Sequence, residues 1–143
     1  MAGPTPGERR QFGEQVAWTE APNIFGMRLA GEVDGPSLDA LIAYQRAWGA
    51  ERGHIFVLCD LSAVTGATPE ARRVLQGTRH TSPMTHVCFG AKFTIRIFAE
   101  MVMRAARFLR TSPPDMHIVF FANEAEARAY IASTRLPRRA RRL

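Results

Sequence analysis

Apolar and polar positions along the chain first predict a set of strands. Residues 15–20 alternate between apolar and polar side chains, as a half-buried strand does, and residues 24–29 continue as the second strand of a hairpin. Residues 54–61 form a nearly continuous apolar run, which is typical of a strand covered on both faces. Residues 84–90 and 116–121 are expected to form two further strands.

Four helical segments alternate with these strands, and three of them carry start signals. Ser37 is expected to cap the first helix after a break in the chain. Thr68 is expected to cap the second helix, with Pro69 at its first position. Asn123 is expected to cap the last helix, with Glu126 at the position of a capping box.

The clearest helical period runs over residues 93–110. Its apolar side is predicted at Phe93, Ile97, Phe98, Met101, Val102, Ala105, Phe108 and Leu109. Its charged side is predicted at Arg96, Glu100, Arg104 and Arg107. This pattern favours a helix whose apolar side packs against the core. If Met103 and Phe108 were both left uncovered, the helix would instead form an apolar groove or a partner surface.

The order ββαβαβαβα predicts an α/β fold. We expect a mostly parallel mixed sheet with an N-terminal antiparallel hairpin at one edge and helices packed on it. Residues 1–13 are expected to form a flexible leader, residues 14–134 a single domain and residues 135–143 an Arg-rich tail. A chain of 143 residues has room for one such domain.

Composition supports a soluble globular protein. Hydrophobic residues make up 46% and charged residues 22% of the chain, which excludes wholesale disorder. No apolar run reaches the roughly 18 residues of a membrane span, and the first twelve residues lack a secretory signal. Two cysteines cannot build a disulfide scaffold, so a cytoplasmic location is expected.

The positive charge is concentrated at the C-terminus. The formal net charge is +6, but five arginines lie among the last nine residues, and the rest of the chain has 14 basic and 13 acidic residues. The block Arg138, Arg139, Arg141 and Arg142 could bind nucleic acid or an anionic membrane. No aromatic residue is interleaved with these arginines, which favours a solvated chain end.

The residue patterns of common enzymes are missing from the sequence. The four histidines stand at no metal-ligand spacing, and Cys59 and Cys88 fall inside predicted strands, where a thiol acts as a small hydrophobe. There is no Gly-rich phosphate loop and no G-x-S-x-G nucleophile elbow. We therefore expect neither catalysis nor a cofactor nor a bound metal.

Two single residues could still serve a binding site. Lys92 follows Gly90-Ala91 between a strand and a helix start, where free N–H groups and a cation could hold an anion; an ordinary strand–helix turn is the alternative. Asp60 lies at the end of a strand, where α/β proteins place functional groups; the alternative is a carboxylate that accepts nearby backbone N–H groups.

The segment Cys59-Asp60-Leu61-Ser62-Ala63-Val64 resembles the D-L-S-x-V motif that ends a strand in the STAS domain of bacterial anti-sigma factor antagonists (SpoIIAA-like). Residues 120–131 are similar to the last strand and helix of those domains. The resemblance extends over residues 16–131. It implies a regulatory protein without enzymatic activity, which binds an anti-sigma or kinase partner until a serine at a helix start is phosphorylated.

The phosphorylated motif of that family is not preserved here. Counted without gaps from Asp60, its D-S-S-G falls on Thr68-Pro69-Glu70-Ala71, so a glutamate occupies the acceptor position. We hypothesise that the chain lacks the serine switch and carries a permanent charge instead. The residues expected to contact the partner lie in a predicted loop, residues 62–67, and its flanks: Asp60, Ser62, Thr65, Thr68 and Glu70.

Two alternatives remain open at this point. The layered pattern is also similar to Sec14-like lipid-binding domains, which would make the chain a small carrier or sensor for a lipid-like or anionic ligand near Lys92. Homodimerisation is plausible through the hairpin edge or through the long helix.

Overall fold

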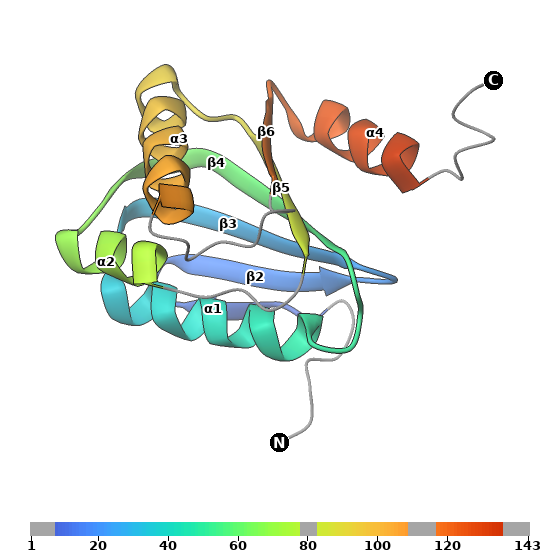
Figure 1. Cartoon of the computed structure of the whole chain (residues 1–143), viewed down its shortest axis with the longest axis horizontal. Coiled ribbons are helices and arrows are strands. Elements are labelled where there is room, and N and C mark those ends of the chain that lie inside the picture. Colours follow the sequence, from blue (N-terminus) through green and yellow to red (C-terminus); the bar gives the residue numbers. More distant parts are fainter. Residues whose placement is uncertain (1–7, 78–82, 109–116, 136–143) are drawn as a thin grey trace.

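A single mixed sheet organises the protein. The computed structural model describes residues 8–77, 83–108 and 117–135 (Figure 1). Six strands form the sheet in the order in which they occur in the chain: β1 (Arg10–Phe12), β2 (Gln15–Glu20), β3 (Ile24–Val33), β4 (Ile55–Ala67), β5 (Met84–Phe89) and β6 (His117–Phe121). Four helices connect or follow them: α1 (Gly35–Gly49), α2 (Pro69–Gly77), α3 (Phe93–Phe108) and α4 (Glu124–Arg135).

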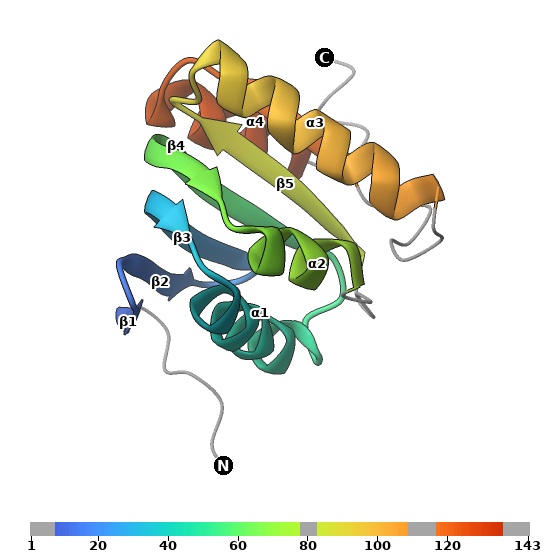
Figure 2. The same cartoon turned by 90° about the vertical axis from the view of Figure 1, so that its left-hand side faces the viewer.

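The directions of the strands confirm the predicted α/β fold. Strands β1, β2 and β3 are antiparallel neighbours, whereas β3, β4, β5 and β6 are parallel. Helices α1, α2 and α3 cover one face of the sheet, and α4 covers the other (Figure 2). None of the described helices combines the length and apolarity of a membrane span.

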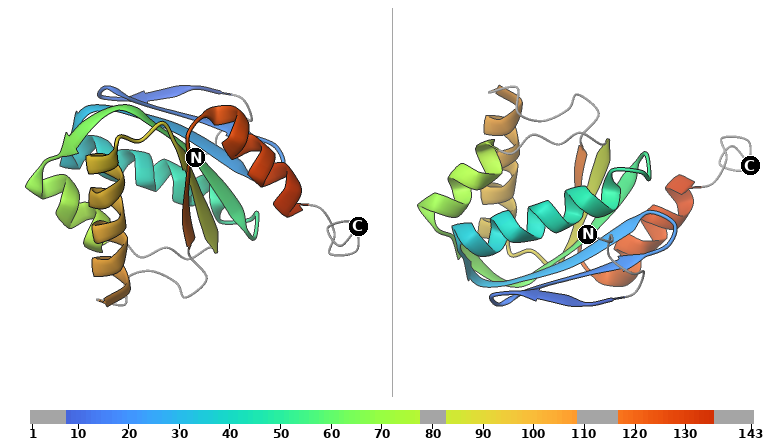
Figure 3. Two further views of the ribbon diagram at one scale, coloured as in Figure 1. Left: turned by 90° about the horizontal axis from the view of Figure 1, so that it is seen from above. Right: turned by 90° about the horizontal axis from the view of Figure 1, so that it is seen from below.

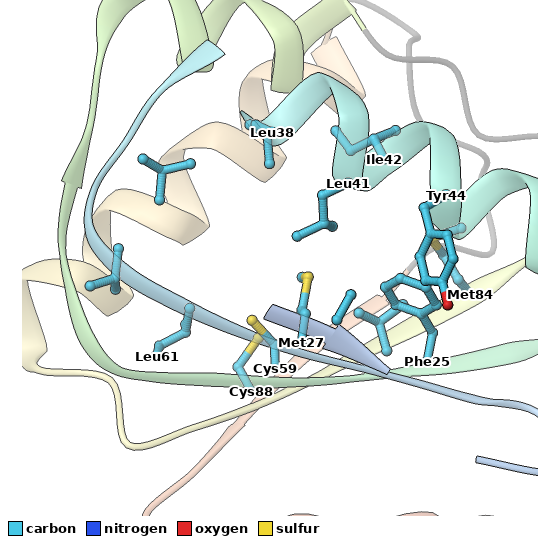
Figure 4. Packing of buried hydrophobic residues seen from close by; sticks show 14 of the residues in the cluster. Phe25, Met27, Leu38, Leu41, Ile42, Tyr44, Cys59, Leu61, Met84 and Cys88 are labelled. Carbon is cyan, nitrogen blue, oxygen red and sulfur yellow. The ribbon is translucent and has the colours of Figure 1, made fainter. Parts of the chain in front are cut away.

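Each face of the sheet has its own hydrophobic core. The larger core lies between the sheet and α1, where Phe25 is fully buried against the Tyr44 ring (Figure 4). The Trp48 ring also packs near Phe25, with the ring centres 6.1 Å apart. The smaller core lies under α4 and contains Leu58 and Val87. Side chains along β4 and β5 alternate between these two cores, so nearly every position must be apolar. The sequences of these parallel strands are therefore continuous apolar runs.

An ion pair connects α4 to the N-terminal hairpin of β2 and β3. The Arg128 guanidinium donates two hydrogen bonds to the Glu20 carboxylate, at 2.8 and 2.9 Å, and a third to Glu124. Glu20 and Glu124 raise the pKa of Arg128. The Trp18 indole N–H donates to the same Glu20 carboxylate at 2.8 Å. The last described helix is thereby joined to one of the first strands.

The sheet begins earlier than the sequence predicted. Strand β1 lies within the expected leader and pairs with β2, so the leader prediction is wrong at its C-terminal end. Phe12 packs against the Tyr44 ring, and the Arg10 guanidinium lies 4.7 Å from the centre of that ring. A strand of three residues is too short to show a period of two, which is why the pattern missed it.

Strand β4 continues through the segment predicted to be a loop. Residues 62–67 belong to β4, and four of them, Ala63, Val64, Gly66 and Ala67, are register partners of β3, so the loop prediction there is wrong. Between the pairs Arg28↔Asp60 and Ala30↔Ala63, β4 contains one residue more than β3, and a second extra residue follows Val64. Such bulges shift side chains between faces, so the alternation that marks a strand is lost.

The first helix is capped by a different residue from the one predicted. Asp34, not Ser37, is the N-cap of α1, and its carboxylate accepts hydrogen bonds from the Ser37 backbone N–H at 2.8 Å and the Ser37 hydroxyl at 2.9 Å. These bonds lower the pKa of Asp34. Aspartate and serine are both good caps, so the preference for a cap residue does not distinguish them. Pro36 does distinguish them, because it lies in the first turn only when Asp34 is the cap.

The other two predicted caps are confirmed. The Thr68 hydroxyl accepts a hydrogen bond from the Ala71 backbone N–H at 3.1 Å. The Asn123 side chain accepts from the Glu126 N–H at 2.9 Å, and the Glu126 carboxylate accepts from the Ala122 N–H at 3.2 Å. Each cap satisfies a donor that the first turn of a helix leaves without an intrahelical partner.

Helix α3 is rotated relative to the orientation that its sequence favoured. Phe93, Ile97 and Met101, which were expected to face the core, are 76%, 40% and 61% exposed. Ile95 is buried in their place and Phe98 is half-buried. The core-packing prediction is therefore wrong for these three residues. The side chains of Met103 and Phe108, on which the groove alternative depended, lie outside the described residues.

Candidate functional site

The candidate site lies where the parallel strands end and the first three helices begin. Strands β4 and β5 remain paired only as far as Asp60 and Phe89. Beyond Asp60, β4 continues beside β3 and curves towards α2 (Figure 1). In open α/β sheets, this carboxyl edge is the usual position of binding groups.

The Asp60 carboxylate stabilises the first bulge of β4 by hydrogen bonds. Its Oδ1 accepts hydrogen bonds from the Ser62 backbone N–H at 2.9 Å and from the Ser62 hydroxyl at 2.6 Å. Its Oδ2 lies 3.7 Å from Arg28 Nε on β3. This confirms the alternative in which Asp60 is a carboxylate that accepts backbone N–H groups. The bulge frees the Ser62 N–H, and the carboxylate satisfies it.

The turn after β5 lies directly against this bulge. Gly90 has a φ of 74°, and a Cβ at this position would lie 3.0 Å from the Ser62 Cβ. A side chain at Gly90 would therefore be strained and crowded. Lys92 follows two residues later with an exposed side chain, and its carbonyl accepts the Arg96 N–H at 2.9 Å as α3 begins. The predicted anion-binding residue and the predicted contact residue Ser62 thus belong to adjoining segments.

Glu70 lies where two helices start. It is exposed in the first turn of α2, and its side chain packs against Gly35 at the start of α1. A Cβ at Gly35 would overlap the methylenes of Glu70, so the glycine allows this approach. A carboxylate near helix N-termini is favourable because the positive ends of the helix dipoles point towards it. Thr65, on the preceding strand, is also exposed.

The two cysteines form a buried pair in the larger core. Cys59 and Cys88 are register partners on β4 and β5, and both side chains are buried under α1 (Figure 4). A hydrogen bond with Cys88, together with burial, raises the pKa of the Cys59 thiol. A neutral, buried thiol is a poor nucleophile.

We expect both thiols to be unreactive in the folded protein. Ellman's reagent should label neither cysteine at pH 8, whereas the chain unfolded in guanidinium should react with two equivalents. The pKa of Cys59 in the folded protein is higher than the usual 9.0, so above pH 9 the folded state holds a proton that the unfolded chain releases. The free energy of unfolding should therefore fall as the pH rises past 9.0. Rapid labelling of one thiol in the native protein would contradict this prediction.

The described parts of the chain contain no group of side chains that could hold a metal ion. Across these ranges, no three histidine, cysteine, aspartate or glutamate side chains come together as metal ligands would. His54 instead lies 3.0 Å from the Thr85 hydroxyl through its Nε2. The tail arginines Arg138, Arg139, Arg141 and Arg142 lie outside the described residues.

Two residues of the candidate site, Arg28 and Gly35, were not predicted from the sequence. Arg28 becomes a neighbour of Asp60 only through the parallel register of β3 and β4. Gly35 becomes a neighbour of Glu70 only when α1 and α2 pack together. The sequence of β3 contained a signal for Arg28, because this arginine interrupts the apolar residues of the first half of the strand. Comparisons of the chain with protein-family models, with curated proteins and with solved structures gave no match.

Proposed function

We propose that this protein is a non-enzymatic regulatory module that binds a protein partner in the manner of anti-sigma factor antagonists. The contact region would be the β4–α2 surface, which we define as Ser62, Thr65, Thr68 and Glu70. The resemblance of residues 59–64 to the STAS motif and the position of these residues at the carboxyl edge of the sheet support the proposal.

The observation that carries the proposal is the unpaired edge of β4. After Asp60, the described part of the chain provides β4 with a partner strand on the β3 side alone. Gly90 lies against Ser62, so the open part of this edge begins after Ser62. An exposed strand edge offers N–H and C=O groups that an incoming segment can bind by adding a strand. The exposed side chains of Ser62 and Thr65 would give such a contact its specificity.

Glu70 would give the surface a permanent negative charge. In the family that the chain resembles, phosphorylation at this position breaks the complex. A glutamate carries one negative charge, where phosphoserine carries about −1.5 to −2. The packing of Glu70 on Gly35 fixes the carboxylate near the start of two helices. We propose that partner binding here is constitutive and is not switched by phosphorylation of this helix start.

Site-specific photo-crosslinking in cells tests the proposal. A crosslinker placed at Ser62 or at Thr65 should capture the same protein, and Glu70→Lys should abolish capture because it reverses the charge of the surface. The control position is Gln11, which is exposed on the edge strand β1 and is separated from β4 by β2 and β3. Mass spectrometry of the recovered chain should find no phosphate on residues 62–70.

Three results would count against the proposal. Equal capture from Gln11 would mean that the β4–α2 surface is not selective. Capture that survives Glu70→Lys would mean that the carboxylate plays no part. Stoichiometric phosphate on residues 62–70 would restore a phosphorylation switch.

A further inference from the structure

Helix α4 is attached to the sheet by few buried side chains. In the described part of the chain it is the helix that covers the second face of the sheet, opposite α1, α2 and α3 (Figure 3). Among its described side chains, Ala127 and Ile131 are the two buried ones, and Tyr130 is half-buried beside the Phe121 ring. Helix α1 buries eight residues on the other face. Because burial of apolar surface supplies most of the stability of a fold, α4 is held more weakly than α1.

The sheet face under α4 is strongly apolar. Four side chains of the central strands β4 and β5 are buried there: Phe56, Leu58, Val87 and Phe89. If α4 moved away, these side chains would face water, which is unfavourable, but the twelve residues of α4 would gain conformational freedom. The position of α4 therefore decides whether this apolar face is accessible.

The polar contacts of α4 are exposed to water. Arg128 and Glu20, which join α4 to β2, have side chains 40% and 30% exposed. An ion pair at this exposure contributes little stability, because water competes for both partners. The capping bonds of Asn123 and Glu126 are local, so they stabilise the start of the helix without connecting it to the other strands. The contacts that hold α4 on the sheet are thus few and independent of the larger core.

We propose that α4 opens as one unit while the larger core between the sheet and α1 stays folded. Opening separates Arg128 from Glu20, withdraws Ile131 from the smaller core and exposes the sheet face around Leu58. Proteins open in such cooperative units, with free energies below that of global unfolding. A helix of this length is marginal in water by itself, so the released segment loses its helical hydrogen bonds. The device regulates access to the second face of the sheet and is separate from the β4–α2 surface.

Native-state hydrogen exchange of the purified full chain tests the proposal. The backbone amides of residues 128–134 should have protection factors at least about a hundredfold lower than those of β4 and α1. The amides of α4 exchange through its own opening, whereas those of β4 and α1 require global unfolding. The protection of residues 128–134 should also be similar along the segment, because one event releases them together.

Substitutions in the two cores separate local opening from global unfolding. Ile131→Ala weakens the contact of α4 with the sheet, so the amides of α4 should exchange about 30-fold faster or more. The amides of β4 should be accelerated by the same factor, since global unfolding also breaks this contact. Ile42→Val is the matched control, because it weakens the larger core, which the open state retains. It should accelerate the exchange of β4 about fivefold and leave that of α4 unchanged.

A thiol placed under α4 reports the exposure of the apolar face. Val87 is fully buried in the smaller core, and Val87→Cys changes its size little. Ellman's reagent should label this thiol faster than Cys59 and Cys88, which lie in the larger core. Ile131→Ala should accelerate the labelling about 30-fold or more, and Ile42→Val should not change it. The purified chain is used alone, so the result is independent of any partner at the β4–α2 surface.

Three outcomes would overturn the proposal. Protection that falls steadily towards the C-terminal end of α4 would mean that the helix frays residue by residue. Acceleration of α4 and β4 by the same factor in Ile42→Val would mean that α4 opens only when the whole chain unfolds. Labelling of Val87→Cys that is no faster than that of Cys59 would mean that the apolar face stays covered.

Discussion

Replacing Phe25 by alanine is expected to lower the free energy of unfolding by about 3–5 kcal/mol. Phe25 is fully buried, and its ring centre lies 5.6 Å from that of Tyr44 and 6.1 Å from that of Trp48. The substitution would leave a cavity between β3 and α1 that the surrounding rings fill only in part. Urea denaturation followed by circular dichroism measures the change.

Phe93→Ala is the matched control for this experiment. The same side chain is removed, but Phe93 is 76% exposed on α3, so the free energy of unfolding should change by less than about 0.5 kcal/mol. Equal losses in the two variants would mean that the orientation of α3 described above is incorrect.

Gly26→Ala is expected to cost about 1–3 kcal/mol, because the methyl group would overlap a neighbouring ring. The Trp18 ring of β2 lies directly over Gly26 of β3, where a Cβ would collide with its atoms. To make room, the ring must move, and its N–H must leave the Glu20 carboxylate. Glu20 also holds Arg128, so the displacement should reach α4. Denaturant unfolding and tryptophan fluorescence report the two effects.

Gly66→Ala tests whether the cost comes from the collision. Gly66 also lies in a strand, but no atom lies within 4 Å of a Cβ built there. Alanine has less conformational freedom than glycine in the unfolded chain, so this variant should be neutral or slightly stabilised. A similar loss at both positions would refute the overlap of Trp18 with Gly26 as the cause.

The parallel part of the sheet was predictable because burial on both faces leaves a strong mark in the sequence. Strands β4, β5 and β6 begin within one residue of the predicted positions. The second half of β4 was not predictable, because its two bulges put polar and small residues where alternation requires apolar ones. Only pairing with β3 reveals that segment as a strand.

The orientation of α3 could not be read from periodicity. The helix has one set of apolar residues around Phe93 and Ile97 and another around Ile95 and Phe98, and together they cover much of its circumference. A helix of this kind can bury either set, and packing against α2 and the sheet decides which. The predicted apolar side combined Phe93, Ile97 and Met101, which the structure leaves exposed, with Phe98, which is half-buried, and it omitted the buried Ile95.

The candidate site was predictable where its contacts are local. Asp60 bonds two residues ahead and Thr68 three residues ahead, so short-range rules identify both. The contacts of Arg28 with Asp60 and of Gly35 with Glu70 join segments that are distant in the chain. They depend on strand register and helix packing, which a single sequence does not specify.

The bond between Arg128 and Glu20 has a consequence for how the protein is made. These residues are 108 positions apart, so the contact closes a loop that contains most of the chain. During synthesis, the hairpin emerges from the ribosome long before its partner helix exists. We expect the hairpin to gain its full protection from hydrogen exchange only after α4 has been synthesised and has packed against it.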